Sequence, residues 1–145
     1  MQFDQLYREK RLSADDAVRL VRDGDTIVVP TGPAETPLLL AALSEQRHDF
    51  NDVKVAQILP IKKHAYFDPE TTQHVRHVAY FFGPASRPGG QEGWNDYLPA
   101  YFSELPGLIK QGLSPADVVF SVASPMDEHG YFSLGLAADY TMAAV

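Results

Sequence analysis

Four short apolar runs, separated by helical or turn-rich segments, constrain the fold of this 145-residue chain more than any other feature. The runs are residues 26–29, 53–59, 75–82 and 118–123. β-Branched and aromatic residues are typical of strands, and the last run is apolar enough to be buried on both faces, as parallel strands are. The runs therefore predict a mostly parallel sheet flanked by helices, which is an α/β fold.

Helix signals lie on both sides of the first run. The predicted helices cover residues 14–23 and 38–43. Ser13 can N-cap the first helix, and Gly24 can close it. The residues that would share its apolar face are Ala17, Leu20 and Val21. Thr36 followed by Pro37 offers an N-cap and a first helical position for the second helix. The order helix, strand, loop, helix supports the α/β prediction.

The second half of the chain is less regular. Residues 83–93 contain four glycines and two prolines, which predicts a loop with neither helix nor strand. Beyond it, the sequence predicts a short strand over residues 97–105, a helix over 106–111 closed by Gly112, and a C-terminal helix over 137–145. The apolar residues of that last segment would favour self-association, so we expect a homo-oligomer. No linker divides the chain, so we expect residues 1–145 to form a single α/β domain.

Charge and composition exclude several classes of function. The net charge of -7 disfavours nucleic acid and anionic membranes as partners, because both require a basic face. The absence of cysteine excludes disulfides and thiolate nucleophiles and fits a reducing compartment. The first residues are too charged for a signal peptide, and no apolar run reaches the roughly 18 residues of a membrane helix. We therefore expect a cytoplasmic protein.

Three loops follow predicted strands, at the position where parallel α/β sheets bind ligands. They cover residues 30–36, 83–93 and 124–130, and we expect them to converge at one end of the sheet. In the first, backbone N–H groups near Gly32 and Ala34 could hold an anion beside Glu35, although the pattern is also typical of a plain turn. Arg87 in the second loop could pair with a carboxylate or phosphate, or could simply be solvated.

The histidines do not form a recognisable metal or catalytic motif. His74 and His77 would lie on opposite faces of the predicted strand, which disfavours a shared metal ion. His129 follows two acids and could belong to an acid–base pair, but a turn bonded to the local backbone is favoured. Dinucleotide-binding and Walker-type glycine motifs do not occur. The sequence therefore predicts neither a metal site nor a nucleotide cofactor.

Several short motifs together resemble the N-terminal part of the acetyl-CoA hydrolase/transferase family of coenzyme A transferases. They are Leu6-Tyr7, LSADDAV at 12–18, Gly24-Asp25, AETP at 34–37, NDV at 51–53, SPMDEHG at 124–130 and DYTM at 139–142. The elements at 124–130 and 139–142 are the most specific. Thr36 departs from the proline that is frequent in the family, and this leaves the interpretation of its loop unchanged.

The resemblance implies a fold of the CoA-transferase type and a function in CoA transfer. Family members have two similar α/β domains and pass CoA between acetyl-CoA and a short acid, such as 4-hydroxybutyrate, through a thioester on a glutamate of the second half. We therefore expect no catalytic residue in this chain, no activity of the chain alone, and coenzyme A as a substrate rather than a cofactor. Alternatives are an acetyl-CoA hydrolase and a non-catalytic acyl-CoA-binding or assembly module. The residues expected to shape the acid pocket are Gly32, Ala34, Glu35, Arg87, Ser124 and Pro125.

Overall fold

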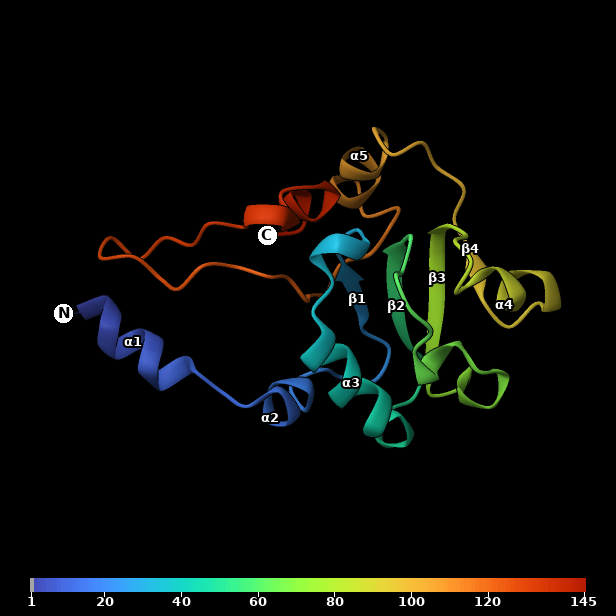
Figure 1. Cartoon of the computed structure of the whole chain (residues 1–145), viewed down its shortest axis with the longest axis horizontal. Helices are drawn as coiled ribbons and strands as arrows, with labels where there is room; N and C mark the ends of the chain where they lie inside the picture. The colour runs from blue at the N-terminus through green and yellow to red at the C-terminus, as the bar shows by residue number, and fades with distance from the viewer. Residues whose placement is uncertain (1) are drawn as a thin grey trace.

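A parallel sheet organises the structure, a computed structural model that describes residues 2–145 (Figure 1). In this part of the chain the sheet has five strands, in the order β4-β3-β2-β1-β5. The strands are β1 (Thr26–Val29), β2 (Val53–Ile58), β3 (Val75–Phe81), β4 (Asp96–Tyr97) and β5 (Val118–Val119). Every pair of neighbours is parallel, so the predicted α/β fold is confirmed.

The central strands match the prediction, whereas both edge strands are shorter than predicted. β5 ends at Val119, and Val122 is 43% exposed, so burial of this run on both faces was a wrong prediction. The predicted strand over residues 97–105 is wrong beyond Tyr97. Leu98 still donates its N–H to the carbonyl oxygen of Ala79, so one backbone hydrogen bond extends the pairing past Tyr97.

The two predicted N-terminal helices form, and one is shorter than expected. α2 (Ala14–Val18) begins where Ser13 accepts a hydrogen bond from the Asp16 N–H, as predicted. It ends five residues before the predicted position, which leaves Leu20 68% exposed. Gly24 has a positive φ of 84°, but its N–H donates to Asn51 instead of closing the helix. α3 (Pro37–Glu45) confirms the second helix.

The glycine-rich segment contains a helix, so its prediction as a pure loop is wrong. α4 (Arg87–Glu92) ends at Gly93, whose φ of 86° suits glycine. A side chain on Gly89 would lie within 2.1 Å of Asn95 Nδ2, and one on Gly90 would meet the ring of Phe82. Close packing therefore accounts for the central glycines and outweighs their weak helix propensity.

The C-terminal segment forms 3-10 turns where an α-helix was predicted. α5 (Leu105–Lys110) confirms the preceding helix, and Gly112 follows it with a φ of 71°. The final turns are η5 (Gly135–Ala137) and η6 (Tyr140–Ala143). Asp139 caps the second of these by accepting the Thr141 N–H at 2.9 Å. Tyr140, the first residue of η6, contacts the sheet through its hydroxyl.

The sheet separates two apolar clusters. One face packs against α2, α3 and the 3-10 turn η3 (Ala65–Phe67), and the other packs against α5 and η6. The remaining 3-10 turns are η1 (Gly32–Ala34), η2 (Arg47–Asp49) and η4 (Pro69–Thr71). No helix between residues 2 and 145 combines the length and apolar character needed to cross a membrane.

A hairpin extends away from the sheet and lies beside the N-terminal helix (Figure 1). We call residues 124–133 the hairpin arm. Ser124 donates its N–H to the carbonyl oxygen of Ser133 at 2.8 Å, which joins the two sides of the arm. Tyr7 of α1 (Gln2–Lys10) contacts Phe132, with ring centroids 6.4 Å apart. The arm therefore packs on α1 and not on the sheet.

Candidate functional site

The pairing of β2 becomes irregular on both sides at its carboxyl end. On the β3 side the pairing slips between Gln57 and Ile58, so that Ile58 lies opposite Phe81. Leu59 then adopts a positive φ of 50°, a conformation that is uncommon for a residue other than glycine. Such outliers persist only where surrounding contacts hold them, and they concentrate at functional sites.

Two adjacent C-terminal residues bind the ends of β1 and β2. The Tyr140 hydroxyl donates to the carbonyl oxygen of Val29 and accepts the Ile58 N–H at 3.3 Å. Asp139 Oδ2 accepts the Thr31 N–H at 2.8 Å. The Tyr140 ring is buried, and this burial raises the pKa of its hydroxyl well above the usual value. The hydroxyl therefore stays protonated and able to donate.

The Glu35 carboxylate is fixed beside these strand ends. Its Oε1 accepts one hydrogen bond from Gln57 Nε2 at 2.7 Å and another from the Ile61 N–H at 3.0 Å. Gln57 is fully buried on β2, whereas Glu35 is half-buried at the end of η1. The pair connects the loop after β1 to the loop after β2, so the two loops hold each other in place.

Gly32 lets the same two loops approach closely. A Cβ atom at this position would lie 2.6 Å from the Leu59 carbonyl oxygen and 2.7 Å from Ile61 Cγ1. Beside it lies a hollow of about 310 Å³, which we call the acidic-loop hollow. Its lining residues are Gly32, Pro33, Glu35, Pro37, Ile61 and Lys62. Protein backbone occupies the space near Gly32, so a larger residue there would disturb the fold as well as any bound ligand.

The predicted convergence of three loops holds for two of them. Gly83 and Gly32 both approach Leu59, in the loop after β2: a Cβ atom on Gly83 would lie 3.4 Å from Leu59 Cδ2, and one on Gly32 would lie 2.6 Å from the Leu59 carbonyl oxygen. The loop of residues 124–130 does not converge: Ser124 and Pro125 are exposed in the hairpin arm, and Gly130 packs against Phe3 of α1. The chain leaves the sheet directly after the short edge strand β5, which carries this loop away from the hollow.

The structure also places the other predicted ligand groups. The Ala34 N–H already donates to the Thr31 carbonyl oxygen at 2.8 Å, so it is engaged within the turn. Arg87 is exposed on α4, where it donates to the Phe82 carbonyl oxygen at 3.4 Å. Gln57 and Lys62 were not among the predicted site residues, and Tyr140 entered only as part of the motif at 139–142. A buried glutamine within an apolar strand was the one available signal for Gln57.

Two buried histidines lie near the loop that lines the hollow. His64 stacks on Tyr66 with ring centroids 5.2 Å apart, and His77 contacts Phe67 edge to face at 4.5 Å. Burial lowers the pKa of His64 to about 4, with a further contribution from the charge of Lys62, and burial lowers that of His77 to about 3. Both imidazoles are therefore neutral at pH 7.

The remaining histidines lie apart from this buried pair, and His48 contacts His74 edge to face at 5.1 Å. His74 Nδ1 lies 2.8 Å from the Phe50 carbonyl oxygen, away from the buried ring of His77. Within residues 2–145, no group of three or more His, Cys, Asp or Glu side chains could hold a metal ion. His129 lies in a turn whose amides donate to Asp127 Oδ1, which confirms the interpretation of this segment as a turn.

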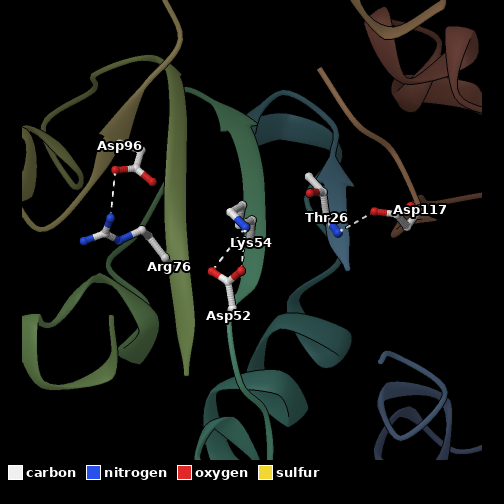
Figure 2. Close-up of polar contacts among 6 residues, drawn as sticks. All are labelled: Thr26, Asp52, Lys54, Arg76, Asp96 and Asp117. Atoms are coloured by element: carbon white, nitrogen blue, oxygen red, sulfur yellow. Dashed lines mark hydrogen bonds and ion pairs between the residues drawn. The ribbon is translucent and has the colours of Figure 1, made fainter. Parts of the chain in front are cut away.

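A second set of polar side chains lies at the amino ends of the same strands (Figure 2). Thr26, Lys54 and Arg76 are cross-strand neighbours in one row, which we call the amino-end row. Lys54 pairs with Asp52 at 3.1 Å, and Arg76 pairs with Asp96 at 3.0 Å. A groove of about 460 Å³ borders this row, but both cations of the row are already paired with carboxylates. We therefore place the candidate site at the smaller acidic-loop hollow.

A family model and individual relatives indicate the same protein family. Residues 1–145 match the acetyl-CoA hydrolase/transferase N-terminal domain. The chain is 36% identical to succinyl-CoA:cyclohexane-1-carboxylate CoA transferase of Geobacter metallireducens, over 99% of this chain and 32% of that protein. It is 30% identical to 4-hydroxybutyrate coenzyme A transferase of Clostridium kluyveri, over 99% of this chain and 34% of that protein. The chain thus spans about a third of the length of these relatives.

Solved structures share the fold. RipA from Yersinia pestis superposes with a TM-score of 0.85 at 28% identity, over 99% of this chain and 36% of that chain. The 4-hydroxybutyrate CoA-transferase from Porphyromonas gingivalis superposes with a TM-score of 0.76 at 28% identity, over 98% of this chain and 32% of that chain.

Proposed function

We propose that this chain, which belongs to the acetyl-CoA hydrolase/transferase family, forms the acid-binding part of a CoA-transferase. In this proposal the enzyme moves CoA between acetyl-CoA and a short carboxylic acid such as 4-hydroxybutyrate. The acidic-loop hollow carries the proposal, because its wall is fixed by the bonds that Gln57 and Ile61 donate to Glu35. Relatives named as CoA-transferases support the same class of reaction.

The lining of the hollow suits a short acid. Ile61 and two prolines offer apolar surface to a short alkyl chain, and Lys62 offers a cation to a carboxylate. Glu35 Oε1 is occupied by two hydrogen-bond donors, which lowers its nucleophilicity and suits a role in holding the loops. Gly32 and Glu35 line the hollow and remain in the proposed acid site, whereas Ala34 is buried with its N–H already engaged, and its contact with a ligand stays a prediction. Direct ligand contacts by Arg87, Ser124 and Pro125 stay predictions.

The covalent chemistry would use the glutamate that lies in the second half of the chain in members of the family. Its carboxylate attacks the acyl-CoA carbonyl and displaces the thiolate, which leaves an anhydride. The thiolate then attacks the glutamyl carbonyl, which releases the first acid and gives a glutamyl-CoA thioester. The acceptor acid reverses both steps and leaves as the new acyl-CoA. Each intermediate requires a pocket that excludes water, because water in place of the acceptor acid would make the enzyme a hydrolase.

Titration of the chain with 4-hydroxybutyrate tests the acid site directly. We expect amide NMR shifts to concentrate at Gly32, Ile61 and Lys62. The matched control ligand is 1,4-butanediol, which has the same length without the carboxylate, and Lys62→Met should weaken binding of the acid but not of the diol. Equal shifts for both ligands, or shifts confined to the hairpin arm, would remove the hollow from the acid site.

Assays with acetyl-CoA separate the enzymatic alternatives. We expect the chain alone to show neither CoA transfer to 4-hydroxybutyrate nor thioester hydrolysis, and no covalent CoA adduct by mass spectrometry. A fusion to the remaining two thirds of the Clostridium kluyveri relative should transfer CoA in preference to hydrolysing acetyl-CoA. An adduct on the chain alone that disappears in Glu35→Gln would contradict our assignment of the nucleophile. Acetyl-CoA binding by an inactive fusion would favour the non-catalytic module.

We also propose a cytoplasmic homo-oligomer that associates with neither nucleic acid nor membranes. The apolar side chains of Leu136, Met142 and Val145 are each more than half exposed and offer a surface for self-association. Sedimentation velocity over a range of concentrations tests this, because a monomer at every concentration would exclude association of the chain through that surface.

A further inference from the structure

We infer that Tyr140 is a positioning residue for the acidic-loop hollow. Its hydroxyl replaces one rung of the sheet, that is, one backbone hydrogen bond between neighbouring strands, and holds β1 and β2 apart where the hollow begins. Asp139 replaces the following rung. The identity of the ligand rests on the proposed function, whereas the replacement of the rungs rests on geometry alone.

The register of β1 and β2 identifies the missing rungs. Lys54 lies opposite Thr26 and donates its N–H to the Asp25 carbonyl oxygen at 2.9 Å. In a parallel ladder this pattern repeats every two residues. The Ile58 N–H would therefore donate to the Val29 carbonyl oxygen.

The Tyr140 hydroxyl stands between those two groups. It accepts the Ile58 N–H at 3.3 Å and donates to the Val29 carbonyl oxygen. One direct backbone hydrogen bond is thus replaced by two bonds through a side-chain oxygen. The inserted oxygen separates the two backbone groups that would otherwise meet.

The next rung is replaced in the same way. Continuing the ladder, the Thr31 N–H would donate to the carbonyl oxygen of Ile58. It donates instead to Asp139 Oδ2 at 2.8 Å. Two adjacent side chains from the C-terminal segment therefore replace two successive backbone partners, and this is why β1 and β2 part at this point.

The separated strand ends determine the shape of the hollow. Gly32 lies three residues beyond the end of β1, and its Cα is so close to the Leu59 carbonyl oxygen that no Cβ fits between them. Ile61, which donates to Glu35, lies two residues further along the same loop. A change in the spacing of Val29 and Ile58 would therefore move both walls of the hollow.

Tyr80 provides a matched control for Tyr140. Both rings are buried, and they contact each other edge to face at 5.5 Å. The Tyr80 hydroxyl bonds to Ser114 Oγ at 2.6 Å and lies outside the β1–β2 junction. Replacing either tyrosine with phenylalanine removes one buried hydroxyl, but only Tyr140→Phe removes the inserted oxygen.

Acid affinity measured on these variants tests the inference. We expect Tyr140→Phe to bind 4-hydroxybutyrate about three- to tenfold more weakly than the wild type, the range set by one hydrogen bond. Tyr80→Phe should bind within about twofold of the wild type. Equal affinities in the two variants, whether both weakened or both unchanged, would overturn the positioning role.

A second measurement reports on the rung without any ligand. Scalar coupling across a hydrogen bond should be absent between the Ile58 amide nitrogen and the Val29 carbonyl carbon of the wild type, and present in Tyr140→Phe once the strands close. Direct coupling in the wild type would overturn the inference even if the variant failed to fold. A wild type that lacks the coupling and binds no acid would instead contradict the proposed function and leave the replaced rung established.

Discussion

Polar side chains lie at both ends of the three central strands, but their interactions differ between the two ends. At the amino-end row, Lys54 and Arg76 keep about a third of their side chains exposed and form ion pairs between side chains. At the carboxyl end, Gln57 and Tyr140 are buried and uncharged, and they bond a carboxylate and the backbone.

The two ends therefore contribute differently to stability. Ion pairs at a solvent-exposed surface contribute little to the free energy of unfolding, because water already stabilises both partners and salt screens their attraction. A buried hydrogen bond leaves an unpaired group in an apolar site when it is broken, so it determines where the backbone lies. We therefore expect changes at the amino-end row to be tolerated and changes around the hollow to be costly.

Acid should produce the largest effect, through the buried neutral histidines. Because burial lowers the pKa of His64 to about 4 and that of His77 to about 3, the unfolded chain binds more protons once the pH falls below about 6.5. Stability is therefore full above pH 6.5 and declines as the pH falls towards the two folded-state pKa values. Urea unfolding should show a loss on the order of 3 kcal/mol between pH 7.5 and pH 5.0.

Two variants assign this pH dependence. His77→Phe should reduce the slope of stability against pH over that interval, because it removes one of the two buried imidazoles. His129→Gln should leave the slope unchanged, because the His129 side chain is exposed in the hairpin arm. An unchanged slope in His77→Phe would show that other groups dominate the acid response.

Gly32→Ala should produce the next largest effect. The added methyl group would overlap the Leu59 carbonyl oxygen, and overpacking of this kind costs about 1–3 kcal/mol. The matched control is Gly107→Ala, because the nearest atom to a Cβ there is Gln111 Nε2 at 3.7 Å. In helix α5 that change should stabilise the protein by roughly 0.5–1 kcal/mol. Chemical denaturation of the two variants measures both effects. Losses of stability of similar size would show that the close approach to Leu59 does not require glycine at position 32.

Gln57→Leu should cost about 1–2 kcal/mol, because it removes a donor from the half-buried Glu35 carboxylate. Hydrogen exchange at the Ile61 amide should also accelerate, since the loop would lose its anchor. Asn51→Ala breaks a comparable amide–carboxylate contact with Asp23 at an exposed site, where we expect a smaller loss of stability. Faster exchange at Ile61 in both variants would indicate general loosening instead of a local role for Gln57.

The smallest effects should come from the amino-end row. Lys54→Met and Arg76→Met should each change stability by less than about 1 kcal/mol, because both ion pairs are partly exposed. Unfolding at low and high salt checks the physical reason, since any loss should shrink as the salt concentration rises. A larger, salt-independent loss at either position would remove the contrast between the two ends of the sheet.

The elements that depend on a local pattern of residues could be predicted from the sequence. The β-branched run of β1 and the Pro37 signal of α3 specify their elements within a few residues, so the order of helix, strand, loop and helix along the chain could be anticipated. The helix α4 was missed because its glycines pack against Phe82 and Asn95, contacts that a local pattern does not report. Tertiary packing outweighed propensity there.

The candidate site was predicted only in the loop after β1, and the loop after β2, which supplies Ile61 and Lys62, was missed. Gly32 and Glu35 were found because a loop after a parallel strand is a usual ligand position. Tyr140 contacts Val29 across 111 residues of sequence, and neither residue alone suggests the other. Ser124 was misplaced because the length of the edge strand β5, and hence the direction of the arm, depends on packing at the sheet edge.

The short outer strands have a consequence for how the protein behaves in crowded solution. β4 and β5 each contain two residues, so the sheet presents few unpaired backbone groups along either side. A strand from another molecule that docked there would gain too few hydrogen bonds to remain attached. The apolar central strands, which are the segments best suited to build amyloid fibrils, are thus shielded from templated growth while the domain stays folded.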